Sequence, residues 1–542
     1  MTLVEELHKI MEGEVDNSDA ALTTYSRDAS LFSVRPQVVV YPKTVADMQR
    51  LIHYVADRPD QNLSLTIRSG GTCMSGGSIN ESIIVDVNRH LHHIQSVQDF
   101  MITTQPGAFY RDFEKKTLEH GLLMPSYPAS REICTVGGMV NNNAGGEKTL
   151  AYGKTERYVK QLKVLLRDGK EYTLEALNRH ELDMKMQQDD LEGDIYRRMY
   201  ALLEDNFNAI QTAKPHVTKD STGYHLWNVW DRRTFDLSKL FVGSQGTLGI
   251  TSEITFRLIH PKPHSTMLVI FLRDISALAQ IVKTVLRYTP ESFESYDDHT
   301  LSIALKYFPQ MLKQMGGNVF TLGLRFLPEL KLLVTGGLPK LILLAEFTGP
   351  SKDEVQRRAH AARAALQSFD IKTRVTKNAA EAKKYWVIRH ESFNLLRNKV
   401  KDKHTAPFID DLTVRAAQLP QFLPRLDEIL SRYDITYTVA GHIGDANFHI
   451  IPLMDLTDPK QRDIIPKLAK EVYDLVFEFH GSMSGEHNDG LIRSPFLKQM
   501  YGEQIYELFA ETKRIFDPDN MFNPNKKIGT TLEYAMEHLA RD

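Results

Sequence analysis

Two short segments contain the side chains best suited to catalysis. Gly441-His442-Ile443-Gly444-Asp445-Ala446-Asn447-Phe448-His449 has two histidines seven residues apart. On one straight strand this odd spacing points them to opposite faces, so they converge only if the chain turns at Gly444-Asp445. The second segment, Ser484-Gly485-Glu486-His487-Asn488-Asp489-Gly490, adds a carboxylate and a third imidazole. A lone histidine is usually a hydrogen-bonded structural residue. The two segments together favour a divalent cation with an open coordination position.

Three glycine-rich segments, 68–77, 135–146 and 242–250, each lie beside an apolar stretch. Glycine lets backbone N–H groups approach a ligand closely and adopt positive φ, which favours anion binding. Each segment alone could be an ordinary turn, but three of them suit a long dinucleotide lying across several strand ends. A Walker loop is excluded because Lys148 stands where its first glycine should be, and no GxGxxG lies between a strand and a helix.

These segments need a framework of strands and helices to hold them. Residues 38–87 predict a small α+β unit, with a strand at 38–42, a helix capped by Thr44, and strands at 63–68 and 83–87. Further strands are expected near 101–105, 161–167 and 249–258. From Pro261 a strand–helix–strand rhythm predicts a second α+β domain on an antiparallel sheet, with 316–340 as an insertion loop or hairpin.

The composition is that of a globular enzyme. A chain of 542 residues predicts two or more domains, and a net charge of -3 gives no general attraction to nucleic acid. No apolar stretch is long enough to span a bilayer, and the acidic N-terminus does not resemble a secretory signal. With two cysteines and no CxxC pair, we expect no iron–sulfur cluster and a cytoplasmic protein, with peripheral membrane contact left open.

The segments Arg68–Gly77, Pro125-Ser126, Thr135–Gly146 and Gly243–Ile250 together resemble the flavin-binding domain of the vanillyl-alcohol oxidase superfamily. The branch resembled most is that of the D-lactate, glycolate and D-2-hydroxyglutarate dehydrogenases. The resemblance implies an α+β fold: a two-subdomain FAD-binding domain of the p-cresol methylhydroxylase (PCMH) type, plus an α+β substrate (cap) domain with an antiparallel sheet. We expect the FAD-binding domain over 1–260, the cap domain with the metal site over 261–505, and a C-terminal segment, 506–542, returning to the FAD-binding domain.

The resemblance also implies the FAD contacts, with the pyrophosphate on the 68–77 loop. Relatives with covalent flavin often have histidine where this chain has Thr72, so we expect non-covalent FAD. Gln245 replaces a glutamate of many relatives, with little expected consequence. The expected FAD-binding residues are Arg68, Ser69, Gly70, Gly71, Thr72, Ser75, Gly76, Gly77, Pro125, Thr135, Gly137, Gly138, Asn142, Gly145, Gly146, Gly243, Gly246, Thr247, Gly249, Ile250 and Asn523.

The relatives carry GHxGDGNxH and GEHGxG motifs. By resemblance His442, His449 and Glu486 are metal ligands (Zn, Mn or Fe) and His487 is the catalytic base. Arg389, in a segment similar to the family's WxxR, is expected to bind the substrate carboxylate, although a lone arginine is more often a surface charge.

The chain departs from these family motifs at a few positions. Ala446 replaces a glycine, Asn488-Asp489 suggests a more polar wall beside His487, and Asp220 stands in a Lys-Asn-x-x-Gly-Tyr segment near the flavin.

The expected function is metal-assisted oxidation of a D-2-hydroxy acid to the 2-keto acid by hydride transfer to FAD. D-lactate is favoured, with D-2-hydroxyglutarate or glycolate as alternatives. A dicarboxylate would need a second cation, for which Lys403 and His404 are candidates. The electron acceptor is expected to be a quinone, an electron-transfer protein or a dye. The alternatives are a flavoenzyme similar to alkyl-dihydroxyacetonephosphate synthase and a non-catalytic FAD-binding subunit of an electron-transfer complex.

Overall fold

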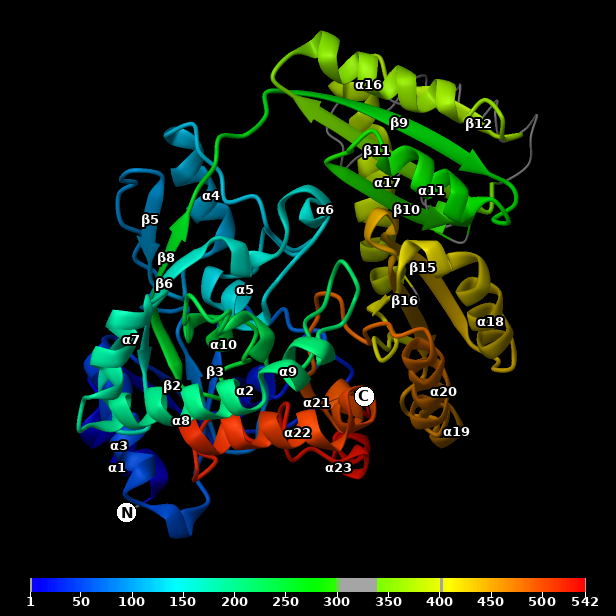
Figure 1. Ribbon diagram of the computed structural model, residues 1–542. Coiled ribbons are helices and arrows are strands. Elements are labelled where there is room, and N and C mark those ends of the chain that lie inside the picture. Colours follow the sequence, from blue (N-terminus) through cyan, green and yellow to red (C-terminus); the bar gives the residue numbers. More distant parts are fainter. Residues whose placement is uncertain (1, 299, 302–338, 400–402, 542) are drawn as a thin grey trace.

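The computed structural model describes residues 2–298, 300–301, 339–399 and 403–541. Side chains from 390 to 402 and most of the predicted insertion at 316–340 lie outside the described residues. The described chain forms three sheets (Figure 1). Two four-stranded sheets with helices α1–α10 form one body, and an eight-stranded sheet with helices α11 and α16–α20 forms the other. No helix in the described ranges is long and apolar enough to cross a membrane.

The first sheet has the strand order β1-β2-β4-β3. Strands β2, β3 and β4 are parallel, and β1 is antiparallel to β2. Thr44 caps α3 by accepting a hydrogen bond from the Asp47 N–H, as its sequence position predicts. The loop that follows β3 carries the first glycine segment. The elements are α1 (Leu3–Ile10), β1 (Glu14–Asp16), α2 (Asp19–Tyr25), β2 (Val38–Tyr41), α3 (Val45–Ala56), β3 (Leu65–Arg68) and β4 (Ile83–Asp86).

The second sheet is antiparallel, with the order β5-β8-β6-β7. Its strands are β5 (Met101–Thr104), β6 (Val159–Leu165), β7 (Glu171–Glu175) and β8 (Ile250–Arg257). Its helices are α4 (Tyr110–Glu119), α5 (Val136–Asn142), α6 (Thr149–Tyr152), α7 (Arg179–Met186), α8 (Leu191–Asp205), α9 (Phe207–Ala213) and α10 (Ser238–Phe241). The sequence predicts a turn at the second glycine segment, whereas the structure has helix α5 there. The Thr135 hydroxyl accepts the Gly138 N–H and caps its first turn.

The third sheet is antiparallel, as predicted from the sequence, and has the order β12-β9-β11-β10-β15-β16-β13, with β14 paired to β16. Side chains alternate along β9 and β11, so α11 and α16 pack on one face and α17 on the other. The strands are β9 (His264–Leu272), β10 (Ser292–Asp297), β11 (Leu341–Gly349), β12 (Lys372–Val375), β13 (His404–Thr405), β14 (Leu412–Thr413), β15 (Thr436–His442) and β16 (Asn447–Met454). The helices are α11 (Leu278–Leu286), α16 (Lys352–Ala365), α17 (Ala379–Lys399), α18 (Leu419–Ser431), α19 (Pro459–Arg462) and α20 (Ile464–Glu478).

The C-terminal part of the chain runs back along the first body (Figure 1). Helix α22 (Leu497–Phe516) contacts α8, and its Phe509 and Phe516 join the core of the second sheet. Short helices α21 (Gly490–Arg493) and α23 (Leu532–Glu537) flank it. Asn523 donates hydrogen bonds to the carbonyls of Gly77 and Gln245, so the tail connects two glycine segments.

Candidate active site

A hairpin brings the two histidines of the first motif together. His442 ends β15, the 3₁₀ turn η5 (Ile443–Asp445) reverses the chain, and His449 lies on β16 opposite Ala440. The rings of His442 and His449 meet edge to face with centroids 5.1 Å apart. The turn at Gly444-Asp445 therefore produces the convergence that the spacing requires. Ala446 has a φ of 49°, a left-handed conformation that explains why glycine is usual at this position.

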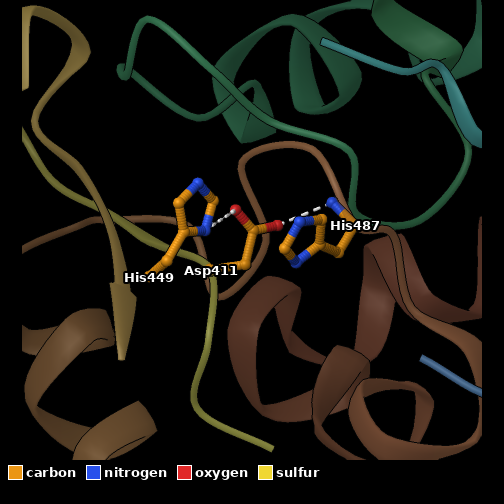
Figure 2. A group of neighbouring side chains, drawn as sticks. All are labelled: Asp411, His449 and His487. Atoms are coloured by element: carbon orange, nitrogen blue, oxygen red, sulfur yellow. Dashed lines mark hydrogen bonds and ion pairs between the residues drawn. The ribbon is translucent and has the colours of Figure 1, made fainter. Parts of the chain in front are cut away.

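Glu486 and His487 are held by the buried carboxylate of Asp411. Its Oδ2 accepts the N–H groups of Glu486 and His487 at 2.8 and 2.7 Å and the Ser484 hydroxyl at 2.7 Å. Its Oδ1 accepts a hydrogen bond from Asn447 Nδ2 at 3.0 Å. Figure 2 shows Asp411 between the rings of His449 and His487. Asp411 thus fixes the loop against the strand that bears His449.

Three imidazoles converge on one carboxylate oxygen. The Nε2 atoms of His442, His449 and His487 lie 3.2, 3.3 and 3.7 Å from Oε1 of Glu486. The rings of His449 and His487 stack with centroids 5.1 Å apart. Residues from a hairpin and a distant loop therefore form one compact cluster.

The remaining ring nitrogens of the two motif histidines are already engaged. His442 Nδ1 lies 2.7 Å from Oε1 of Glu294, and His449 Nδ1 lies 2.8 Å from the carbonyl oxygen of Asp410. Because a carboxylate and a carbonyl are acceptors, both Nδ1 atoms must donate, which leaves the Nε2 lone pairs free when the rings are neutral. Metal-ligating histidines typically have such an outer partner.

The residues present fit a divalent metal at His442, His449 and Glu486. One donor atom from each of these residues lies within 4.8 Å of the others, and the set of two imidazoles and a carboxylate suits a borderline cation. Asp411, His449 and His487 also lie close together, but Asp411 is fully used as a hydrogen-bond acceptor and His449 Nδ1 donates elsewhere. This second trio organises the loop, and we do not assign a metal to it.

The pKa values reflect this concentration of charge. Burial opposes ionisation of Glu486, but the nearby Lys219 ammonium and His442 hold its pKa well below the usual range. Burial likewise disfavours protonated His442 and His487, yet adjacent carboxylates, Glu294 for His442 and Asp411 and Asp410 for His487, raise each pKa to about 9. For His449 burial prevails and lowers the pKa. When a divalent cation is bound, its positive charge balances the carboxylates in place of the imidazole protons.

Two cations, Arg389 and Lys219, pair with carboxylates at the cluster. Arg389 Nη2 lies 3.3 Å from Oε2 of Glu294, whose other oxygen contacts His442. The fully buried Lys219 lies with Nζ 3.1 Å from Oε2 of Glu486 and 3.7 Å from Oδ2 of Asp445. Arg389, which is predicted to bind the substrate, is therefore connected to the expected metal ligand His442 through the side chain of Glu294.

The glycine segments converge beside this cluster. Thr135 Oγ1 donates to Ser69 Oγ at 2.6 Å, which joins the first segment to the second, and Gln245 Nε2 contacts Ser75 Oγ at 3.4 Å, which joins the first to the third. In the described chain, the backbone N–H groups of residues 70–74 and of Gly76 donate no hydrogen bond to another protein group. Gly71 and Gly246 have positive φ, and a Cβ on Gly246 would project into open space. An open cradle of unengaged N–H donors fits the phosphates of FAD.

The same segments hold the Glu486 loop. Asn142 Nδ2 donates to the Glu486 carbonyl at 2.8 Å, and Ser75 Oγ donates to the His487 carbonyl at 3.2 Å. The Gly490 N–H donates to Gln245 Oε1, a contact that a glutamate could also accept. Lys154 Nζ donates to the Gly485 carbonyl at 2.8 Å, and burial lowers its pKa to about 8. The expected flavin site and the histidine cluster are therefore adjacent.

Other expected FAD contacts have structural partners that do not themselves point to a ligand. Arg68 donates to the Tyr25 carbonyl and stacks on its ring. Ile250 packs in the core of the first sheet, and Gly249 lies against the Leu165 carbonyl. Pro125 is buried.

The structure shows where the residues of two expectations near the substrate lie. The side chains of Asn488 and Asp489, expected to make the wall beside His487 more polar, are buried and bind the Lys527 ammonium at 2.9 and 2.8 Å. His404 is exposed and pairs with Met454, five residues along β16 from His449, or about 16 Å at the rise of a strand. Neither His404 nor its neighbour Lys403 is seen in contact with the cluster. Asp220 accepts hydrogen bonds from Thr222 and Ser482 and pairs with His225, which accounts for an acid there.

Sequence reasoning missed the residues that position the motifs: Glu294, Asp410, Asp411 and Lys154. Asp410-Asp411 offered a signal, since two acids that directly follow the apolar pair Phe408-Ile409 must be buried and paired if that pair is buried. Glu294 and Lys154 had no comparable signal.

Comparison with known families agrees with this geometry. Residues 36–175 match the family described as FAD binding domain, and residues 261–527 match the family described as FAD linked oxidases, C-terminal domain. A D-2-hydroxyglutarate dehydrogenase of Haemophilus influenzae is 26% identical over 535 residues, which cover 95% of this chain and 50% of that protein. The chain thus spans about half the length of this relative. A D-lactate dehydrogenase of Archaeoglobus fulgidus is 25% identical over 536 residues, covering 97% of this chain and 99% of that protein.

Solved structures share the fold. A p-cresol methylhydroxylase with substrate bound matches with a TM-score of 0.68 at 15% identity, over 98% of this chain and 96% of that one. An alkyldihydroxyacetonephosphate synthase matches with a TM-score of 0.64 at 16% identity, over 96% and 85% of the two chains. At these identities the likeness concerns the fold alone. The predicted fold class, a PCMH-type FAD-binding fold with an antiparallel cap sheet, is confirmed.

Proposed function

Because the chain belongs to the FAD-linked oxidases, we propose that it is a dehydrogenase that oxidises a small D-2-hydroxy acid to the 2-keto acid. FAD is bound without a covalent link, and a divalent metal assists. The observation that carries the proposal is the convergence of three imidazole Nε2 atoms on Glu486 Oε1, beside loops with unengaged N–H groups. An unidentified quinone, electron-transfer protein or dye reoxidises the flavin.

The cofactors divide the chemistry between them. The loops 68–77, 135–146 and 242–250 would hold FAD, which would supply the hydride acceptor for the oxidation of the substrate at C2. A metal (Zn, Mn or Fe) on His442, His449 and Glu486 acts as a Lewis acid toward the substrate oxygens when it is bound. We propose the domain division given above, with the C-terminal segment returning to the FAD-binding domain.

The protein's own residues bind and orient the substrate and move one proton. Arg389 pairs with the substrate carboxylate and so fixes the direction of the C2 hydrogen. His487 Nε2, which lies 3.7 Å from Oε1 of the proposed metal ligand Glu486, accepts the hydroxyl proton. Lys219 neutralises Glu486 from its second oxygen.

D-lactate is the favoured substrate, ahead of D-2-hydroxyglutarate and glycolate. A second carboxylate needs a second cation, and the candidate His404 is exposed and distant along β16. The relatives' names include D-2-hydroxyglutarate and D-lactate dehydrogenases, so a panel of acids is the direct comparison.

The experiment is anaerobic addition of each D-hydroxy acid to the purified flavoprotein while the yellow absorbance is followed. We expect D-lactate to bleach the flavin fastest and L-lactate to leave it oxidised. A flavoenzyme without net oxidation, or a non-catalytic subunit, leaves the flavin yellow with every acid, and that result contradicts the proposal. Acid precipitation of the protein should release the yellow colour into the supernatant if FAD is not covalently bound.

A further inference from the structure

Asp410 occupies a buried position between His487 and an arginine. Its Oδ2 lies 2.8 Å from His487 Nδ1, and its Oδ1 pairs with Nη2 of Arg493. The side chains of Asp410 and Arg493 are fully buried. The other Arg493 terminal nitrogen donates to the Asn488 carbonyl at 2.9 Å. The carboxylate is therefore clamped in one orientation, with one oxygen committed to each partner.

This arrangement determines which nitrogen of His487 carries the proton. An ionised carboxylate only accepts hydrogen bonds, so His487 Nδ1 must donate. In the neutral ring Nε2 then has the lone pair, and it is the nitrogen that lies 3.7 Å from Glu486 Oε1. The backbone carbonyl of the same Asp410 imposes the same proton position on His449.

We propose that Asp410 is a positioning residue, which holds His487 with its proton on Nδ1 and its bare Nε2 toward the substrate hydroxyl. The inference rests on the proposed function, in which His487 is the base. When the substrate O–H bond breaks, its proton moves to Nε2 of His487. The resulting imidazolium keeps its other proton on Nδ1 and continues to donate it in a hydrogen bond to Asp410. Arg493 fixes Asp410 and does not touch the reacting atoms. A buried aspartate that orients a catalytic imidazole in this way is well known from the serine protease triad.

Asp410→Asn is the sharpest test because Arg493 dictates how the amide must lie. The guanidinium only donates, so it takes the amide oxygen and turns the amide nitrogen toward His487. That nitrogen donates to Nδ1 and forces the ring proton onto Nε2, where it blocks proton acceptance. The substitution preserves the size of the side chain and the fold of the protein, and it reverses the tautomer of His487.

Two measurements on the holoprotein, loaded with FAD and metal, read out this change. The 15N chemical shifts of selectively labelled histidine report the protonated nitrogen of the neutral His487 ring. Anaerobic single-turnover reduction with D-lactate reports the proton-coupled step. We expect the proton to move from Nδ1 to Nε2 in Asp410→Asn and flavin reduction to slow by about 10²-fold or more, with FAD and metal content unchanged. Asp410→Glu, which keeps the acceptor, should recover part of the rate and retain the Nδ1 proton.

Asp47→Asn is the matched control, since Asp47 is also buried and paired with an arginine, Arg50, at 2.6 Å, but lies on α3. It should leave the tautomer and the rate unchanged. An unchanged tautomer in Asp410→Asn overturns the inference. A reversed tautomer with an undiminished rate upholds the positioning by Asp410 and instead removes His487 from its proposed role as base. If Asp410→Asn does not fold, wild-type spectra with the proton on Nε2 overturn the inference directly.

Discussion

Glu294 Oε1 lies 2.7 Å from Nδ1 of His442, while its Oε2 lies 3.3 Å from Nη2 of Arg389. One buried carboxylate on the central strand β10 therefore contacts both a proposed metal ligand and the proposed substrate-binding arginine. Its two oxygens fix the His442 ring and restrain the guanidinium. The metal site and the substrate carboxylate site are consequently connected through a single side chain.

Glu294→Gln should weaken metal binding by about 10- to 100-fold, the usual effect of losing an outer partner of a ligating histidine. The amide is a weaker acceptor for His442 Nδ1–H, so the ring is held less firmly. Competition with a chromophoric chelator measures the dissociation constant. Glu346→Gln, on the neighbouring strand β11 and without contact to the histidines, is the control; equal affinities in the two variants would contradict the assigned role of Glu294.

His487→Ala should abolish flavin bleaching by D-lactate while FAD stays bound, because the base is lost but the FAD loops are intact. The loss expected for a general base is about 10²- to 10⁴-fold. Stopped-flow absorbance measures the rate, and the flavin-to-protein absorbance ratio measures occupancy. Bleaching at the wild-type rate would rule out His487 as the base.

Removal of the metal should suppress turnover and spare the flavin. His449→Ala deletes a ligand whose Nε2 lies 3.3 Å from Glu486 Oε1, so the variant should purify with FAD and little metal. Elemental analysis measures the metal content and a dye-linked assay measures turnover. Wild-type protein treated with a chelator should show the same loss of metal and of turnover. Full activity of demonstrably metal-free protein would eliminate the metal from the mechanism.

The parts of the site that could be predicted from the sequence are those specified by local patterns. The turn at Gly444-Asp445 is encoded locally, so the convergence of His442 and His449 followed from their spacing. Thr44 as a helix cap and the antiparallel cap sheet likewise follow from local chemistry and periodicity. The family resemblance supplied the roles of Glu486 and His487.

The residues that orient these groups could not be predicted because their contacts are long-range. Asp411 reaches the Glu486 loop only through the pairing of β14 with β16 and of Thr413 with Ser482. Lys527 reaches Asp489 only because the tail returns along the first body. Nothing local in the sequence distinguishes Lys527 and Asp489 from solvent-exposed residues, and the apolar pair before Asp410-Asp411 indicates burial without indicating the partner.

Lys527→Met should destabilise the protein by about 3–5 kcal/mol, the usual cost of removing one partner from a buried ion pair. The Asp489 carboxylate would lose the ammonium that lies 2.8 Å from its Oδ2, and the Asn488 amide oxygen would lose a donor, with both side chains fully buried. Thermal unfolding measures the effect. Lys470→Met removes an exposed pair with Asp474 and should change stability by less than about 0.5 kcal/mol. Similar melting temperatures for the two variants would show that the buried pair is not stabilising.

Glu346 should make stability fall as the pH rises from about 5 to 8. Burial and the neighbouring Glu291 carboxylate raise its pKa to about 7 from its ordinary value of 4.5, against the opposing effect of Lys148. Between these values the folded protein binds the proton that the unfolded chain has released, so this contribution is present at low pH and is lost as the pH passes about 7. Glu346→Gln stays neutral and should lose less stability over the range. Melting temperatures of the wild type and Glu346→Gln at pH 5 and 8 test this. The melting temperature of the variant relative to the wild type should rise by a few degrees between the two pH values. A constant difference would mean that Glu346 ionises normally.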